Sequence, residues 1–250
     1  MTNPNKLEIK EYDASKFSKP NLIVAVPEAG LVGTIAASYL TQQLKMPEVG
    51  YVESDLIPEV VVIHEGRPKP PIRMYGHEDL ALIVSEVPLH SALSYALASE
   101  VAKWAHTKGV KMVIGLTSVP FEGRIEQTEN QKPTILMLAS EESMLNNFND
   151  MGAKRFEEGF LVGTYATLLK ECLFNRQPNL TLMAEAYRQF PDPGAAAVMI
   201  EVLNKVLGIN VEVDELLKQS EEIRLRLRQL MARTQENMKK MSETQPTYYT

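Results

Sequence analysis

The sequence of 250 residues contains a single cysteine, Cys172. A disulfide bond within the chain is therefore impossible, and a metal cluster held by several thiolates is excluded as well. Cys172 stands among Leu169, Leu173 and Phe174. This apolar setting is typical of a small buried side chain rather than of a reactive thiol.

Long apolar runs are also missing. Nowhere do eighteen apolar residues follow one another, so the sequence predicts no membrane-spanning helix. The opening stretch, MTNPNKLEIKEYDASKF, lacks the apolar core of a signal peptide. We therefore expect a cytoplasmic protein with no membrane partner. The NLT at 179–181 matches a glycosylation acceptor, but a protein that is not secreted is not glycosylated there, so the match predicts no modification.

Positive charge is scarce relative to negative charge. Lysine and arginine number 26 against 32 acidic residues, which gives a formal net charge of −6. Non-specific binding of nucleic acid depends on neutralising phosphates with basic side chains. The composition therefore predicts no nucleic-acid partner.

The usual catalytic and nucleotide-binding motifs are absent. Gly30 and Gly33 give GxxG rather than GxGxxG, and no GK[ST] follows for a phosphate-binding lysine. The four histidines lack the H-E-x-x-H spacing of a metal site, and Ser118 lies in GLTSVP rather than in a G-x-S-x-G elbow. The sequence therefore predicts no cofactor and no metal.

What is present is an alternation of strands and helices. Apolar, β-branched runs predict strands buried on both faces at 21–26, 80–87, 111–118 and 133–139, with shorter candidates at 50–54, 59–65 and 71–75. Helical patterns cover 27–44, 90–109, 156–174 and 194–208. This order predicts an α/β domain over residues 1–210, with a mostly parallel central sheet and helices on both faces, like those of phosphorylases and hydrolases. The stretch EGRPKPP indicates some antiparallel pairing.

The pattern LVGTxA occurs twice, at 31–36 and at 161–166. A glycine where a helix meets a strand lets the two backbones approach closely. We interpret both copies as the same packing requirement rather than as a duplication. Anion binding by the free N–H groups at the start of the first of these helices is the alternative.

Residues 211–241 contain no glycine or proline. Leu216, Ile223 and Leu230 fall on one heptad stripe, which predicts a long amphipathic helix that packs on another helix or on a neighbouring subunit. Six basic side chains against one acid give residues 223–241 a net charge of +5.

The last segment, 242–250, has no helical pattern, and Pro246 prevents continuation of the helix. We expect a flexible tail that ends in Tyr248, Tyr249 and Thr250. A mobile end of this kind can insert into a pocket, where a tyrosine buries its ring and its hydroxyl finds a partner. The terminal carboxylate then meets a cation or a group of backbone N–H donors.

Polar residues also collect just beyond the predicted strand ends: Glu28, Glu86, His90, Ser118 and Glu122. In an open α/β sheet ligands bind at that edge. A carboxylate together with His90 is able to perform general acid–base chemistry. A small-molecule enzyme of phosphorylase or hydrolase type is therefore an alternative function, which requires Glu28, Glu86 and His90 to converge in one pocket.

The sequence resembles the proteasome assembly chaperone family, particularly its archaeal members, over roughly residues 20–210. The resemblance is carried by NLIVAVPEAGLVGTIAASYL, LALIVSEVPL, KMVIGLTSVP and GFLVGTYATLL. The ending is similar to the hydrophobic–Tyr–X signature with which proteasome activators and some archaeal assembly chaperones dock between α subunits of the core particle. Tyr248 takes the hydrophobic position, Tyr249 the tyrosine and Thr250 the final carboxylate.

The resemblance implies an ATP-independent, non-enzymatic homo-oligomer that binds the α ring of the proteasome core particle through residues 248–250. Tyrosine at the first position departs from the aliphatic residue of that signature and weakens docking. A third possibility is a purely structural coiled-coil oligomer, with a seam through Ile223 and Leu230 and no role for the tyrosines.

Overall fold

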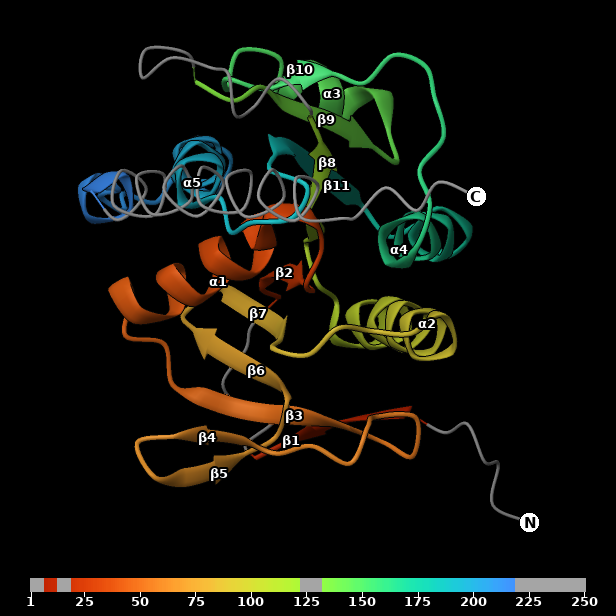
Figure 1. Cartoon of the computed structure of the whole chain (residues 1–250). Helices are drawn as coiled ribbons and strands as arrows, with labels where there is room; N and C mark the ends of the chain where they lie inside the picture. Colours follow the sequence, from red (N-terminus) through yellow and green to blue (C-terminus); the bar gives the residue numbers. More distant parts are fainter. Residues whose placement is uncertain (1–6, 13–18, 122–131, 219–250) are drawn as a thin grey trace, which may run out of the picture.

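The computed structural model describes residues 7–12, 19–121 and 132–218. Nine of the described strands form one twisted sheet in the order β1-β3-β6-β7-β2-β8-β11-β9-β10. Helices cover both faces of this sheet (Figure 1). The expected α/β architecture is therefore present.

The centre of the sheet is parallel. Its four strands are β7 (Leu80–Ser85), β2 (Asn21–Ala25), β8 (Met112–Pro120) and β11 (Asn179–Ala186). Their apolar residues are nearly or fully buried except at the end of β8, where Val119 and Pro120 are exposed, as expected for strands with helices on both sides.

The flanks of the sheet contradict the prediction of a mostly parallel sheet. On one side, β6 (Ile72–His77), β3 (Glu48–Ser54) and β1 (Leu7–Glu11) pair antiparallel in succession with β7. On the other side, β9 (Ile135–Ala139) is antiparallel to β11, and β10 (Lys154–Arg155) is parallel to β9. Strands β6 and β7 are joined by a two-residue turn, which requires antiparallel pairing, whereas β1 and β3, and likewise β9 and β11, pair antiparallel across connections that contain other helices and strands.

Two helices lie on each face. Helices α1 (Val32–Gln43) and α5 (Pro193–Leu207) contact each other on one face, and α2 (Ser91–Lys108) and α4 (Thr164–Phe174) do so on the other (Figure 1). A short helix, α3 (Glu142–Asn147), follows β9. The faces hold two separate hydrophobic cores, centred on α1 and α5 and on α2 and α4.

A small hairpin stands apart from the main sheet. Strands β4 (Val62–His64) and β5 (Arg67–Lys69) pair only with each other among the described strands. Their turn, Glu65 and Gly66, has φ of 50° and 75°, the left-handed conformation that two-residue hairpin turns require. The EGRPKPP stretch therefore forms the antiparallel element that the sequence indicated.

The two LVGT segments differ in the structure. A Cβ on Gly33 would lie 2.3 Å from the Leu116 carbonyl oxygen and 3.1 Å from the Leu116 Cβ, so α1 packs directly on β8 there. Gly163 has φ of 80° and nothing within 4 Å of the position of a Cβ. Close packing is confirmed for the first copy and wrong for the second, where glycine serves the backbone conformation instead.

The helix predicted over 156–174 begins only at Thr164. Gly159 and Gly163 have φ of 154° and 80°, values that a helix does not allow.

Strand β11 had no counterpart in the prediction, because Asn179, Thr181 and Glu185 interrupt its apolar residues. Asn179 and Thr181 are fully buried, and the Thr181 hydroxyl donates to Asn179 Oδ1 at 3.0 Å.

Of the predicted helix over 211–241, the structure describes only residues 211–218, which are helical from Asp214. Leu216 is 2% exposed and packs in the core with α1 and α5. The Tyr39 hydroxyl of α1 donates to the Glu212 carbonyl at 3.0 Å. The chain therefore leaves the body alongside α1.

Candidate functional site

The three residues of the predicted docking tail, Tyr248, Tyr249 and Thr250, lie outside the described residues, as do Ile223 and Leu230. Glu122 also falls outside them. The structure does describe the other polar residues at the strand ends, and it places Glu28 and Glu86 in two hollows on opposite faces of the sheet.

The first hollow is formed at the end of β2. The Thr117 hydroxyl of β8 donates a hydrogen bond to Glu28 Oε2, and the Ser118 hydroxyl donates to the Ala29 carbonyl. Burial raises the pKa of the Glu28 carboxyl, and the hydrogen bond from Thr117 offsets this only in part. Glu28 therefore keeps its proton to higher pH than a surface glutamate does.

We call this space the strand-end hollow; its volume is about 500 Å³. It lies between the end of β2 and the first turns of α2 and α4. The helix that follows β2, α1, lies on one face of the sheet, and the helix that follows β7, α2, lies on the other face. Because β2 and β7 are neighbours, their carboxyl ends form a topological switch point, the place at which α/β sheets bind ligands. Its polar lining residues are Glu28, Ser91, Ser94, Tyr95, Thr164 and Thr167.

Tyr165 holds α4 against the edge of the hollow. Its hydroxyl accepts a hydrogen bond from the Val26 N–H at 3.0 Å and lies 3.4 Å from the Val24 carbonyl. The ring is fully buried, and burial raises the pKa of its hydroxyl. The first turn of α4 is therefore fixed in position relative to Glu28.

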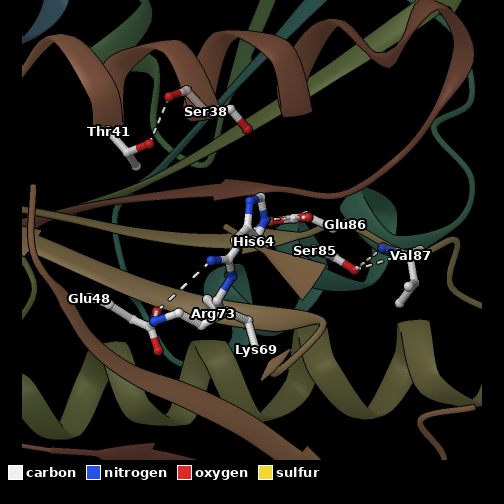
Figure 2. Close-up of polar contacts among 9 residues, drawn as sticks. All are labelled: Ser38, Thr41, Glu48, His64, Lys69, Arg73, Ser85, Glu86 and Val87. Carbon is white, nitrogen blue, oxygen red and sulfur yellow. Dashed lines mark hydrogen bonds and ion pairs between the residues drawn. The ribbon is translucent and has the colours of Figure 1, made fainter. Parts of the chain in front are cut away.

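The second hollow, which we call the charged hollow, has a volume of about 600 Å³ and lies between α1, the hairpin and strands β3, β6 and β7 (Figure 2). Arg73 of β6 lies at its centre and is only 6% exposed. Its guanidinium forms an ion pair with Glu86, and Nη2 lies 2.9 Å from His64 Nε2. The same His64 nitrogen lies 3.1 Å from Glu86 Oε2.

Glu48 completes this network. Its Oε2 lies 2.8 Å from Lys69 Nζ and 3.9 Å from Arg73 Nη1, and the Tyr12 hydroxyl donates to Oε1 at 2.9 Å. Burial opposes ionisation of Glu48, but the hydrogen bonds from Lys69 and Tyr12 and the nearby cations outweigh it and lower the pKa. Burial and the Glu48 carboxylate together raise the pKa of Tyr12 to about 12. Glu48 is thus held ionised by its donors and the nearby cations, and Glu86 is paired with Arg73.

The geometry does not assemble the catalytic group that the enzyme alternative requires. Glu86 belongs to the charged hollow and Glu28 to the strand-end hollow. His90 caps α2: its Nδ1 lies 3.4 Å from the Leu93 N–H, and its Nε2 lies 2.9 Å from the Leu56 carbonyl. Glu28, Glu86 and His90 therefore do not converge.

The other two histidines and the cysteine do not line either hollow. His106 is exposed in the last turn of α2, and His77 ends β6. No group of three or more histidine, cysteine, aspartate or glutamate side chains within the described ranges is arranged to hold a metal ion. Cys172 is buried in the α2–α4 core, and burial raises the pKa of its thiol to about 12, as expected for an inert thiol.

The sequence analysis missed Arg73, Lys69 and Glu48. One signal was available, because Arg73 interrupts the apolar residues Ile72 and Met74 in a strand. A buried arginine requires carboxylate partners. Glu48 lies on β3 and Glu86 follows β7, the two strands that pair with β6, so the partners of Arg73 depend on the order of the strands in the sheet. The sequence does not encode that order in any local pattern.

None of the described helices is both long and apolar enough to cross a bilayer. An uncharacterized protein of Methanocaldococcus jannaschii is 29% identical over 244 residues, which cover 98% of each chain.

Two solved structures from Pyrococcus furiosus are also similar. PbaA, described as an archaeal homolog of proteasome-assembly chaperone, is 30% identical, with a TM-score of 0.81 over 95% of this chain and 96% of its own. PbaB, described as an archaeal proteasome activator, shares the fold at 19% identity, with a TM-score of 0.78 over 90% of this chain and 98% of its own. The PAC2 family matches residues 22–231, which is most of the chain, and the protein belongs to the PAC2 family.

Proposed function

We propose that the protein is an ATP-independent, non-enzymatic chaperone or adaptor of proteasome assembly. It acts as a homo-oligomer and binds the α ring of the core particle. The observation that carries this proposal is the similarity to PbaA along nearly the whole of both chains. Membership of the PAC2 family supports it.

In this proposal the body, residues 1–210, is a scaffold, residues 211–241 are a helical spacer, and residues 242–250 are the binding tail. The rings of Tyr248 and Tyr249 bury apolar area in a pocket between α subunits, and the Thr250 carboxylate binds a cation or backbone N–H groups there. One tail binds weakly, because ordering a mobile segment costs free energy. Several tails on one oligomer raise the overall affinity by roughly 10² to 10⁴.

The surface of the body supports assembly into an oligomer. The loop before α4 and the end of α4 expose large apolar side chains: Phe160 is 97% exposed, Val162 79% and Phe174 72%. Phe160 and Val162 lie two residues apart in one loop, and exposed apolar side chains that gather in this way are typical of protein interfaces. A second copy of the chain that covers it would bring two or more tails together.

The decisive experiment is a pull-down of purified proteasome core particle with the full-length protein and with a variant lacking residues 248–250. We expect the deletion to abolish binding while the oligomer and its melting temperature stay unchanged. Tyr95→Ala is the matched control, since it removes a 54% exposed tyrosine from the body and should leave binding unaffected.

Two outcomes count against the proposal in different ways. Undiminished binding by the truncated variant would refute the role of the tail and place the contact on the body or the spacer. A full-length oligomer that fails to bind core particle at all would refute the proteasome as partner.

A further inference from the structure

The N-terminus of α4 opens into the strand-end hollow. Its N-cap residue is Gly163, which has no side chain to accept a hydrogen bond from the first turn, and that turn contains no acidic residue. At the start of α5, by contrast, Asp192 accepts a hydrogen bond from the Ala195 N–H at 2.9 Å. The first N–H groups of α4 therefore remain available to an acceptor in the hollow.

A second and independent feature of the hollow is the hydroxyl of Thr164. This residue is 5% exposed and lines the hollow. Its hydroxyl forms no hydrogen bond with any residue in the part of the chain that the structure describes. A hydroxyl with no partner in the protein is available as a donor and as an acceptor to a molecule in the hollow.

The other walls of the hollow favour an acceptor of negative charge. Helix α2 also begins there, so two helix N-termini, each with partial positive charge, point to the same space. Ser91 and Ser94 in the first turn of α2 supply two further hydroxyl donors. The one acidic lining residue, Glu28, has its pKa raised by burial, so it takes up a proton at higher pH than a surface glutamate does.

We propose that the strand-end hollow binds a small oxyanion through the first N–H groups of α4 and the hydroxyls of Thr164, Ser91 and Ser94. The volume of about 500 Å³ is much larger than a single sulfate or phosphate group requires. The oxyanion is therefore the anionic group of a small metabolite, which has room for its remaining atoms beside Tyr95. This site lies on the body and does not depend on the tail or on the proteasome.

The test uses the full chain and radiolabelled inorganic sulfate in equilibrium dialysis, with amide chemical shifts to locate the site. We expect sulfate to shift the amide signals of Thr164 and Tyr165 and to leave that of Ala195 unchanged, because Asp192 already occupies the Ala195 N–H. Thr164→Val should weaken binding about tenfold, the factor typical of one hydrogen bond to a charged group. Thr164→Ser should keep the wild-type affinity.

Thr107→Val is the matched control, since the Thr107 hydroxyl bonds to the Lys103 carbonyl of its own helix and does not line the hollow. Ser94→Ala provides a second loss variant should Thr164→Val disturb the start of α4. Absence of sulfate binding, or equal binding by Thr164→Val, Ser94→Ala and the wild type, would overturn the proposal.

A comparison of phosphate with ribose 5-phosphate identifies the source of the anion. Tighter binding of ribose 5-phosphate supports a phosphorylated metabolite as the ligand. Tighter binding of inorganic phosphate would overturn the inference that the rest of the hollow holds the body of a metabolite. Deletion of residues 248–250 should change none of these affinities, which separates this site from the proposed proteasome contact.

Discussion

Replacing Arg73 by methionine tests whether the charged hollow is held together by its central cation. The guanidinium is nearly buried, contacts Glu86 and Glu48, and lies 5.5 Å from the centre of the Tyr75 ring. Methionine keeps much of the side-chain volume and removes the charge. Two carboxylates then face each other without the cation between them.

The expected loss can be estimated from the contacts. Two unit charges 3.9 Å apart, as for Arg73 and Glu48, attract by about 4 kcal/mol at an effective dielectric constant near 20. Removing one partner of a buried pair typically costs about 3–5 kcal/mol. Glu48 keeps Lys69 at 2.8 Å, and the Glu86 side chain is 25% exposed, so we expect the lower end, about 3 kcal/mol.

The assay is urea denaturation at pH 7, checked by thermal melting. A loss of about 3 kcal/mol corresponds to a decrease in Tm of about 6–12 °C for a chain of this size. The additional change Glu86→Gln should recover about 1 kcal/mol, because it removes the carboxylate that has lost its arginine partner. Lys103→Met is the control, since its pair with Glu100 is exposed and spans 3.8 Å, and it should cost under about 0.5 kcal/mol.

Arg73→Met as stable as Lys103→Met would refute this reasoning. So would a deficit that fails to shrink at low pH. Protonation of the carboxylates removes their repulsion, so the difference between Arg73→Met and wild type should be largest near neutrality and decline in acid.

Three further changes follow from single contacts. Gly33→Ala places a methyl group against the Leu116 carbonyl of β8, a strand that is paired on both sides and cannot easily shift. The free energy of unfolding in urea should therefore fall by about 2–3 kcal/mol. A variant as stable as the wild type would contradict the close packing. Tyr165→Phe leaves the buried Val26 N–H without an acceptor and should cost about 1–3 kcal/mol in the same assay, unless a neighbouring group replaces the hydroxyl. Glu28→Gln should flatten the pH dependence of stability. The pKa of Glu28 is higher in the folded than in the unfolded protein, so the wild type loses stability as the pH rises from the unfolded pKa through the folded pKa. The glutamine variant has no carboxyl group to titrate and lacks that loss. Parallel stability curves for wild type and Glu28→Gln between pH 4 and 8 would show that burial does not perturb this carboxyl.

Much of the fold was predictable from local patterns. The helix at 90–109 was located almost to the residue, because a histidine cap at its start and Gly109 in the left-handed conformation at its end mark both boundaries. The central strands β2, β7 and β8 were found from continuous apolar runs. Each helix cap and each apolar run is formed by residues close together along the chain, so it can be recognised in the sequence alone.

The direction of the outer strands and the position of β11 were not predictable in this way. The Thr181 hydroxyl donates to Asn179 Oδ1 inside the sheet, and that contact is invisible in a hydropathy pattern. The predicted convergence of Glu28, Glu86 and His90 was wrong for a related reason. Residues at neighbouring strand ends, such as Glu28 and Glu86, lie on opposite faces of the sheet, and the turn after each strand decides the face.

By itself, the sequence determined the alternation of buried strands and helices, the absence of nucleotide and metal motifs and the resemblance to a family, since each rests on residue types and short spacings. The tertiary structure alone decided that one LVGT copy packs on β8 while the other opens a helix end into a hollow. It also decided that Arg73 gathers Glu48, Glu86 and His64 from three different elements. Both outcomes depend on which segments meet after the chain has folded. Two segments with the same residues therefore have different neighbours in the folded protein. Those neighbours determine the local charge, the burial of the side chains and the space that is left for a ligand.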